Sequence, residues 1–67
     1  MKVVHEYTGD VVNVGDEVVS FRGEPATFVR ISKRPDAPSE GRVLVRWVGG
    51  EEVHYYPSVF GLKIVSK

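Results

Sequence analysis

The sequence predicts a single all-β domain, and three observations lead to that prediction. The residues that favour strands, which are the β-branched and aromatic ones, occur in runs of five to eight. Gly, Pro, Asp and Ser separate these runs, and almost no apolar residues recur at the spacing of an amphipathic helix. The chain has 67 residues and shows no linker, repeat or low-complexity tract, so one domain is expected over 1–67.

Composition limits both stability and chemistry. A chain of this length buries only about 60% of the surface that its unfolded form exposes. The absence of cysteine excludes a disulfide, a thiolate metal site and a Cys nucleophile. The first residues reach Glu6 before any long apolar stretch, which is unlike a signal peptide, and no run approaches the length of a membrane span. We therefore expect a soluble, cytoplasmic protein with no membrane contact.

The first half of the chain predicts a short strand and a hairpin. The short strand covers residues 2–7, and a turn-rich stretch at 8–10 leads into residues 11–14. Gly15 and Asp16 open the next strand at 17–22, and the turn at Gly23–Pro25 returns the chain into a strand at 26–33. The segment 34–41 has two prolines and no large apolar side chain, so it is expected to be an exposed loop.

A second hairpin pairs residues 42–48 with 51–56 around Gly49 and Gly50. An odd-length loop, such as a three-residue turn with a glycine bulge, sets Val43, Val45 and Trp47 on one face with Val53 and Tyr55. The opposite face then carries Leu44, Arg46, Val48, Glu52, His54 and Tyr56. A two-residue loop would instead mix polar and apolar side chains on both faces, so the odd loop is favoured. A 3₁₀ turn at 57–61 and a last strand at 62–66 complete the chain.

This order of elements resembles the Src-homology-3-like (SH3-like) small barrel, which is five-stranded and has a 3₁₀ turn before its last strand. Residues 47–64 (WVGGEEVHYYPSVFGLKI) are similar to the distal hairpin and Pro-Ser turn of such domains. Residues 15–19 (GDEVV) resemble the opening strand of Tudor-like and KOW-type barrels. The resemblance implies a binding domain with the strongly bent five-stranded barrel as its fold.

The chain also departs from the proline-peptide-binding members of that class. Those domains carry an Ala-Leu-Tyr-Asp-Tyr-like stretch and a pair of tryptophans, whereas residues 3–7 keep only Tyr7 and Trp47 stands alone. A proline-rich ligand is therefore not implied. The short chain also resembles small uncharacterised proteins encoded by actinobacterial phages, and that resemblance implies a host or phage protein as partner.

The aromatic residues in the last third are the richest candidate site. Rings left at a barrel mouth form a cage or stacking platform for a cation, a peptide or an unpaired base. The alternative is that Tyr55, Phe60 and Phe21 fill the core. The predicted contacts for a protein partner are Trp47, Tyr56, His54 and Arg46.

Basic residues cluster in the middle of a chain whose nine basic and nine acidic residues balance. Residues 22–46 hold six basic and three acidic side chains. In the nucleic-acid alternative, phosphate contacts come from Arg30, Lys33, Arg34, Arg42 and Arg46. Against it, Glu51 and Glu52 lie near enough in the hairpin to pair with Arg46.

Catalysis is not expected. The two histidines, His5 and His54, are too few and too far apart for a histidine metal site, and no nucleophile accompanies His54. No phosphate-binding glycine loop occurs and no cofactor is expected. Two hypotheses remain, a protein-interaction module, including self-association through a strand edge, and a nucleic-acid-binding barrel.

Overall fold

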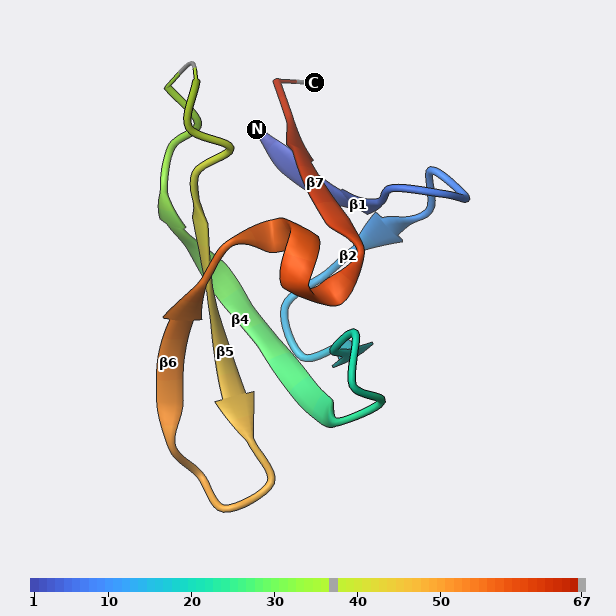
Figure 1. Cartoon of the computed structure of the whole chain (residues 1–67), viewed down its shortest axis with the longest axis vertical. Helices are drawn as coiled ribbons and strands as arrows, with labels where there is room; N and C mark the ends of the chain where they lie inside the picture. Colours follow the sequence, from blue (N-terminus) through green and yellow to red (C-terminus); the bar gives the residue numbers. More distant parts are fainter. Residues whose placement is uncertain (37, 67) are drawn as a thin grey trace.

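Seven strands and one 3₁₀ turn form the regular structure in the computed structural model, which describes residues 1–36 and 38–66. One antiparallel sheet has the order β2-β1-β7, with β1 at Lys2–His5, β2 at Val11–Val12 and β7 at Leu62–Val65. The second has the order β3-β4-β5-β6, with bounds Glu17–Val19, Pro25–Lys33, Arg42–Trp47 and Glu52–Tyr55. The turn η1 (Pro57–Phe60) links β6 to β7 (Figure 1). The all-β class and the 3₁₀ turn are therefore confirmed.

The strands form two separate sheets where the sequence predicted one five-stranded barrel. Across the described residues, no strand pairing joins the two sheets. Part of the difference lies at residues 11–14, where the sequence predicted no separate strand. In the structure, Val11 and Val12 form β2 and pair with β1. Val12 is 4% exposed, so burial of its side chain stabilises this short strand. The predicted strand at 17–22 ends at Val19, because the chain turns at Ser20.

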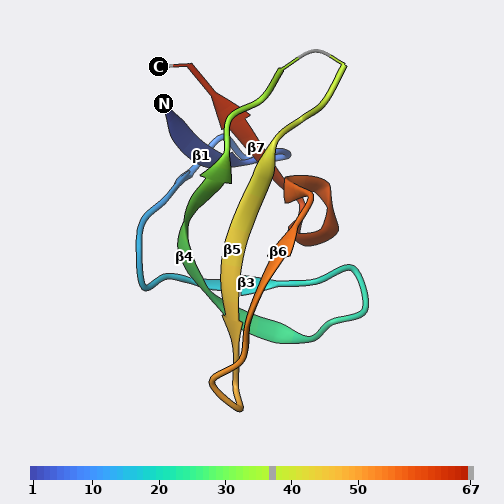
Figure 2. The same ribbon diagram turned by 90° about the vertical axis from the view of Figure 1, so that its left-hand side faces the viewer.

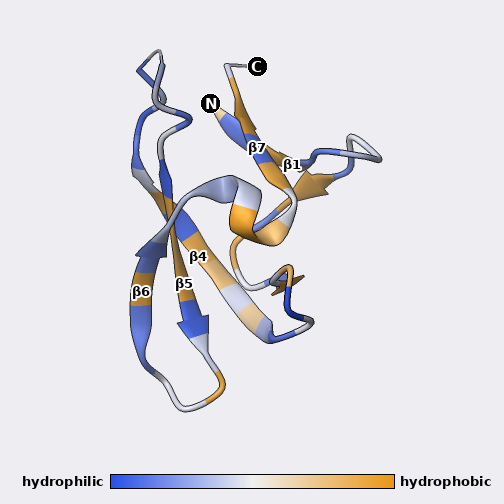
Figure 3. Ribbon diagram, viewed as in Figure 1, coloured by the Kyte–Doolittle hydropathy of each residue, from blue (hydrophilic) through white to orange (hydrophobic). Residues whose placement is uncertain are grey.

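The core fills the space between the two sheets. Val3, Leu62 and Ile64 come from the first sheet, while Val43 and Val45 come from the second and have no exposed surface. The same cluster contains the rings of Phe28 and Phe60 and the smaller side chains Val12, Val18 and Ala26. Figure 3 shows an apolar run between polar residues in β5 and an apolar residue between polar ones in β6. The alternation in β6 is expected of a strand that buries one face and exposes the other to water.

The β5–β6 hairpin has the odd loop that the sequence favoured. Val45 lies opposite Val53, and Arg46 lies opposite Glu52. The Trp47 N–H donates to the Glu51 carbonyl at 2.8 Å, which leaves residues 48–50 as the loop, and Gly50 takes a φ of 93°. A glycine adopts this left-handed conformation without the clash that a Cβ atom would introduce. The prediction of which residues share each face of the hairpin is thus confirmed.

Two irregularities in β4 decide which of its side chains face outward. The pairing shifts between Phe28 and Arg30 and again between Ile31 and Lys33, so Val29 and Ser32 are the extra residues of β-bulges. Strict alternation from Ala26 and Phe28 would have turned Arg30 into the core. After the bulge, Arg30 lies opposite Leu44, on the face that Figure 2 turns toward the viewer.

Candidate binding surfaces

The four side chains predicted to contact a protein partner do not share one surface. Arg46, His54 and Tyr56 lie on the outer face of the β4–β6 sheet. Trp47 lies on the inner face at the hairpin end of the core, where it is half-buried. Trp47 and Tyr56 therefore lie on opposite faces of the sheet, as the hairpin register predicts, because successive side chains of a strand point to opposite faces.

Trp47 is held by two other rings. Its ring centroid lies 5.7 Å from that of Tyr55 and 5.9 Å from that of Phe60, and the latter two are 5.6 Å apart. The Trp47–Tyr55 and Tyr55–Phe60 pairs meet edge to face, an arrangement that contributes about 0.5–1.5 kcal/mol beyond the buried area. Phe60 is buried and Tyr55 half-buried, as the core-filling alternative expected.

Phe21, by contrast, is not a core residue. Its side chain is 76% exposed, because it follows the strand end at Ser20 and enters a tight turn. The turn is well fixed: the buried Ser20 Oγ accepts from the N–H groups of Arg22 at 3.3 Å and Glu24 at 3.2 Å. The Phe21 N–H donates to the Val59 carbonyl of η1 at 2.9 Å. The Phe21 ring is therefore exposed to solvent, although hydrogen bonds hold the backbone of its turn.

The turn and the ring cluster enclose a hollow of about 260 Å³, which we call the aromatic pocket. Phe21, Trp47, Tyr55 and Val59 provide its apolar lining, and Ser20, Arg22 and Glu24 provide its polar lining. Sequence reasoning found Trp47 but missed Phe21. The only available signal was the Gly-Glu-Pro sequence just after Phe21, which places that ring beside a turn rather than inside a strand.

The second surface, which we call the outer array, consists of nine side chains in three rows. Cross-strand partners on one face of a sheet lie about 5 Å apart, so the register fixes the rows. From one end of the sheet to the other, the rows are Lys33, Arg42 and Tyr56; Arg30, Leu44 and His54; and Thr27, Arg46 and Glu52. Leu44 is 6% exposed despite this outward position, which is consistent with cover from the long side chains around it.

Two contacts organise the outer array. Arg46 binds Glu52 through Nη2 at 2.6 Å and Nε at 3.1 Å, as the sequence suggested. The Arg42 guanidinium carbon lies 3.7 Å from the centroid of the Tyr56 ring, and Nη2 donates to the Tyr56 hydroxyl at 3.0 Å. Arg34, the remaining predicted phosphate contact, is exposed just beyond the end of β4.

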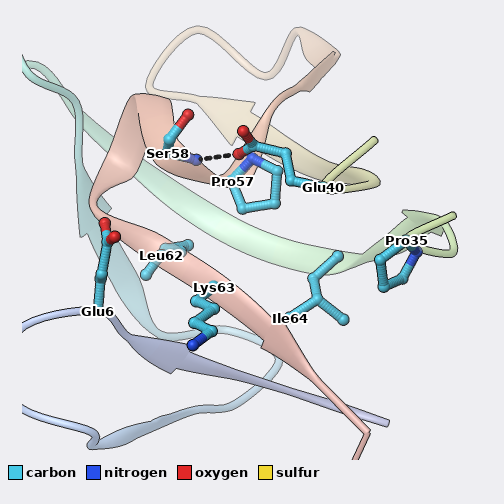
Figure 4. Close-up of a pocket in the computed structure, with 8 residues that line it drawn as sticks. All are labelled: Glu6, Pro35, Glu40, Pro57, Ser58, Leu62, Lys63 and Ile64. Carbon is cyan, nitrogen blue, oxygen red and sulfur yellow. Dashed lines mark hydrogen bonds between the residues drawn. The ribbon is translucent and has the colours of Figure 1, made fainter. Parts of the chain in front are cut away.

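A further hollow, of about 310 Å³, lies beside β7 and contains none of the predicted contact residues (Figure 4). Its charged side chains are Glu6, Glu40 and Lys63. Glu40 Oε1 accepts the Ser58 N–H at 2.9 Å, so this carboxylate closes the η1 turn against the preceding loop. The role of Glu40 here is structural, and the mixture of charges favours no class of ligand.

Within residues 1–36 and 38–66, no three His, Asp or Glu side chains gather in a way that could hold a metal ion. The same residues form no helix long and apolar enough to cross a membrane. Comparison with protein-family models, curated proteins and solved structures finds no match to this chain. The geometry of the two surfaces is therefore the basis for inferring function.

Proposed function

We propose that this chain is a non-catalytic binding module whose aromatic pocket takes an apolar or aromatic side chain from a protein partner. The observation that carries the proposal is Phe21, whose side chain is 76% exposed and lines a pocket with Trp47, while hydrogen bonds hold the backbone of its turn. Aromatic anchors dominate the energetics of protein interfaces, and a backbone that is already held in place reduces the entropy cost of binding.

The polar groups around the pocket favour an uncharged side chain over a cation. The Arg22 guanidinium already lies 5.6 Å from the centroid of the Phe21 ring and opposes a second positive charge there. Glu24, which also lines the pocket, opposes an anion. An apolar group displaces water from three rings without meeting either penalty, so burial of apolar surface supplies the affinity.

The same proposal includes the SH3-like arrangement of the fold. A 3₁₀ turn between the last two strands and two sheets packed around one core support it. With the resemblance to small proteins of actinobacterial phages, the proposed partner is a bacterial or phage protein in the cytoplasm of the host. In this proposal the aromatic pocket binds its partner and performs no chemical step.

Selection from a displayed library of random peptides tests this function, and Trp47 reports binding because it is the only tryptophan. We expect the selected peptides to share an apolar or aromatic anchor and to change the Trp47 emission on titration. Phe21→Ala should weaken binding by about 30-fold or more, since truncating a hot-spot ring costs about 2 kcal/mol. The Phe21 side chain is exposed, so this variant should keep its fold.

Tyr7→Ala is the matched control, because Tyr7 is an aromatic residue that is 91% exposed and lies outside the pocket. It should bind the selected peptides like the parent chain. Equal affinity of the Phe21→Ala variant and the parent, or selected peptides without an apolar anchor, would show that the pocket is not the binding site.

A further inference from the structure

The outer array carries an excess of positive charge, whereas the whole chain is neutral. The chain carries nine basic and nine acidic residues. The outer array holds four of the basic residues and one of the acidic ones, Glu52. Arg34 adds a further cation just beyond Lys33. Folding therefore separates the charges, and one sheet face becomes a local site for anions although the net charge is zero.

The cationic side chains of the outer array differ in the partners that they already contact. Arg46 is paired with Glu52, and this is the only ion pair within the described parts of the chain, residues 1–36 and 38–66. Across those residues, neither Arg30 nor Lys33 forms an ion pair with a carboxylate, and both are exposed. Arg42 contacts the ring and hydroxyl of Tyr56, and neither group neutralises its charge. Three cations thus remain available to an anionic ligand.

The same face offers a surface on which a base can stack. The Arg42 guanidinium is already packed over Tyr56, and the Tyr56 side chain is still 47% exposed. Both groups are planar, and both stack with nucleobases. Tyr56 follows the end of β6, which forms an open edge because, within residues 1–36 and 38–66, it pairs with β5 alone. The exposed His54 stands in the next row of the same edge.

From these observations we propose that the outer array binds single-stranded nucleic acid, with Arg30 and Lys33 on phosphates and a base stacked on the Arg42–Tyr56 pair. Neighbouring strands lie about 4.8 Å apart, so the row from Lys33 to Tyr56 spans roughly 10 Å. Arg42 lies between the two, as the cross-strand neighbour of Lys33. A double helix offers phosphates, but its bases are stacked on one another, so their faces are covered. It could contact the cations of β4 but could not stack a base on the Arg42–Tyr56 pair.

Fluorescence anisotropy with labelled oligothymidylate of about 12 nucleotides tests the proposal. With two phosphate contacts, the logarithm of the affinity should fall with the logarithm of salt concentration at a slope of about −1.4. The double variant Arg30→Ala, Lys33→Ala should flatten that slope by about 1.4, which corresponds to two contacts. Tyr56→Ala should weaken binding about 5- to 100-fold with little change in slope, and Tyr56→Phe should retain most of the affinity.

Arg22→Ala is the matched control, because it removes an exposed basic residue of the aromatic pocket rather than of the outer array. It should leave oligothymidylate binding unchanged, and so should Phe21→Ala, which separates this site from the proposed protein-binding pocket. The proposal is overturned by an absence of binding at low salt, or by equal losses from Arg22→Ala and the double variant. It is also overturned if a blunt duplex or polyglutamate competes as well as the single strand, which would indicate a site for phosphate or for acidic protein alone.

Discussion

Gly41 is the position where one added methyl group should cost this domain most. It is buried at the end of the loop before β5 and has a φ of +87°. A Cβ atom there would lie 2.6 Å from the Lys33 carbonyl oxygen, 2.9 Å from the Pro35 nitrogen and 3.1 Å from Ile64 Cδ1. Two of these neighbours are backbone atoms, which cannot move aside without shifting β4 or the loop.

The expected cost of Gly41→Ala has two parts. The left-handed backbone costs an L-residue about 1–2 kcal/mol, and overpacking typically adds about 1–3 kcal/mol. The sum, about 2–5 kcal/mol, compares with roughly 3–10 kcal/mol for the whole domain at 0.05–0.15 kcal/mol per residue. With an m-value of about 1 kcal/mol/M, the urea midpoint followed by Trp47 fluorescence should fall by about 2–5 M or the variant should be unfolded.

Two other glycines separate the strain from the clash. Gly23 has a φ of +82° and no atom within 4 Å of the position that a Cβ atom would take, so Gly23→Ala should lower the midpoint by only about 1–2 M. Gly49 has neither a left-handed φ nor a close neighbour, and Gly49→Ala should change stability by less than about 1 kcal/mol. If Gly41→Ala and Gly23→Ala proved equally stable, the packing of Gly41 against Lys33 and Ile64 would have no energetic weight and the reasoning would be refuted.

The remaining predictions concern one residue beside each proposed binding surface. Ser20→Ala removes the hydroxyl that accepts the Arg22 and Glu24 N–H groups, so it should lower stability by about 1 kcal/mol in urea and weaken peptide binding by loosening Phe21; unchanged peptide affinity would contradict this role. Glu52→Gln frees Arg46 at a cost below about 1 kcal/mol, because both partners are largely exposed. It should steepen the salt dependence of oligothymidylate binding by about 0.7, and an unaltered slope would count against a phosphate contact by Arg46.

Much of the local structure follows from the sequence, since it depends on neighbours along the chain. Positions 43, 45, 47, 53 and 55 are all apolar or aromatic, which predicted the odd loop of the hairpin, because a two-residue loop would mix polar and apolar side chains on both faces. The pairing of Arg46 with a hairpin glutamate follows from the same register. The 3₁₀ turn after Tyr56 was predictable from Pro57 and the short interval before the last strand.

Only the tertiary structure decided how the segments pair and what each surface contains. The bulge at Val29 turns the Arg30 side chain outward, so its charge stays in water. Strict alternation along β4 would have buried that charge, which costs free energy. The Phe21 side chain is exposed, and its backbone N–H donates to the Val59 carbonyl of η1. Residues 21 and 59 are far apart in the sequence, so no local pattern predicts this hydrogen bond. The sequence by itself determined most of the strands, the 3₁₀ turn and the hairpin faces, because those depend on local conformation and alternation. The division into two sheets, the aromatic pocket and the outer array depend on contacts between segments that are distant in the sequence. Only the tertiary structure shows these features, because local sequence patterns do not encode such contacts.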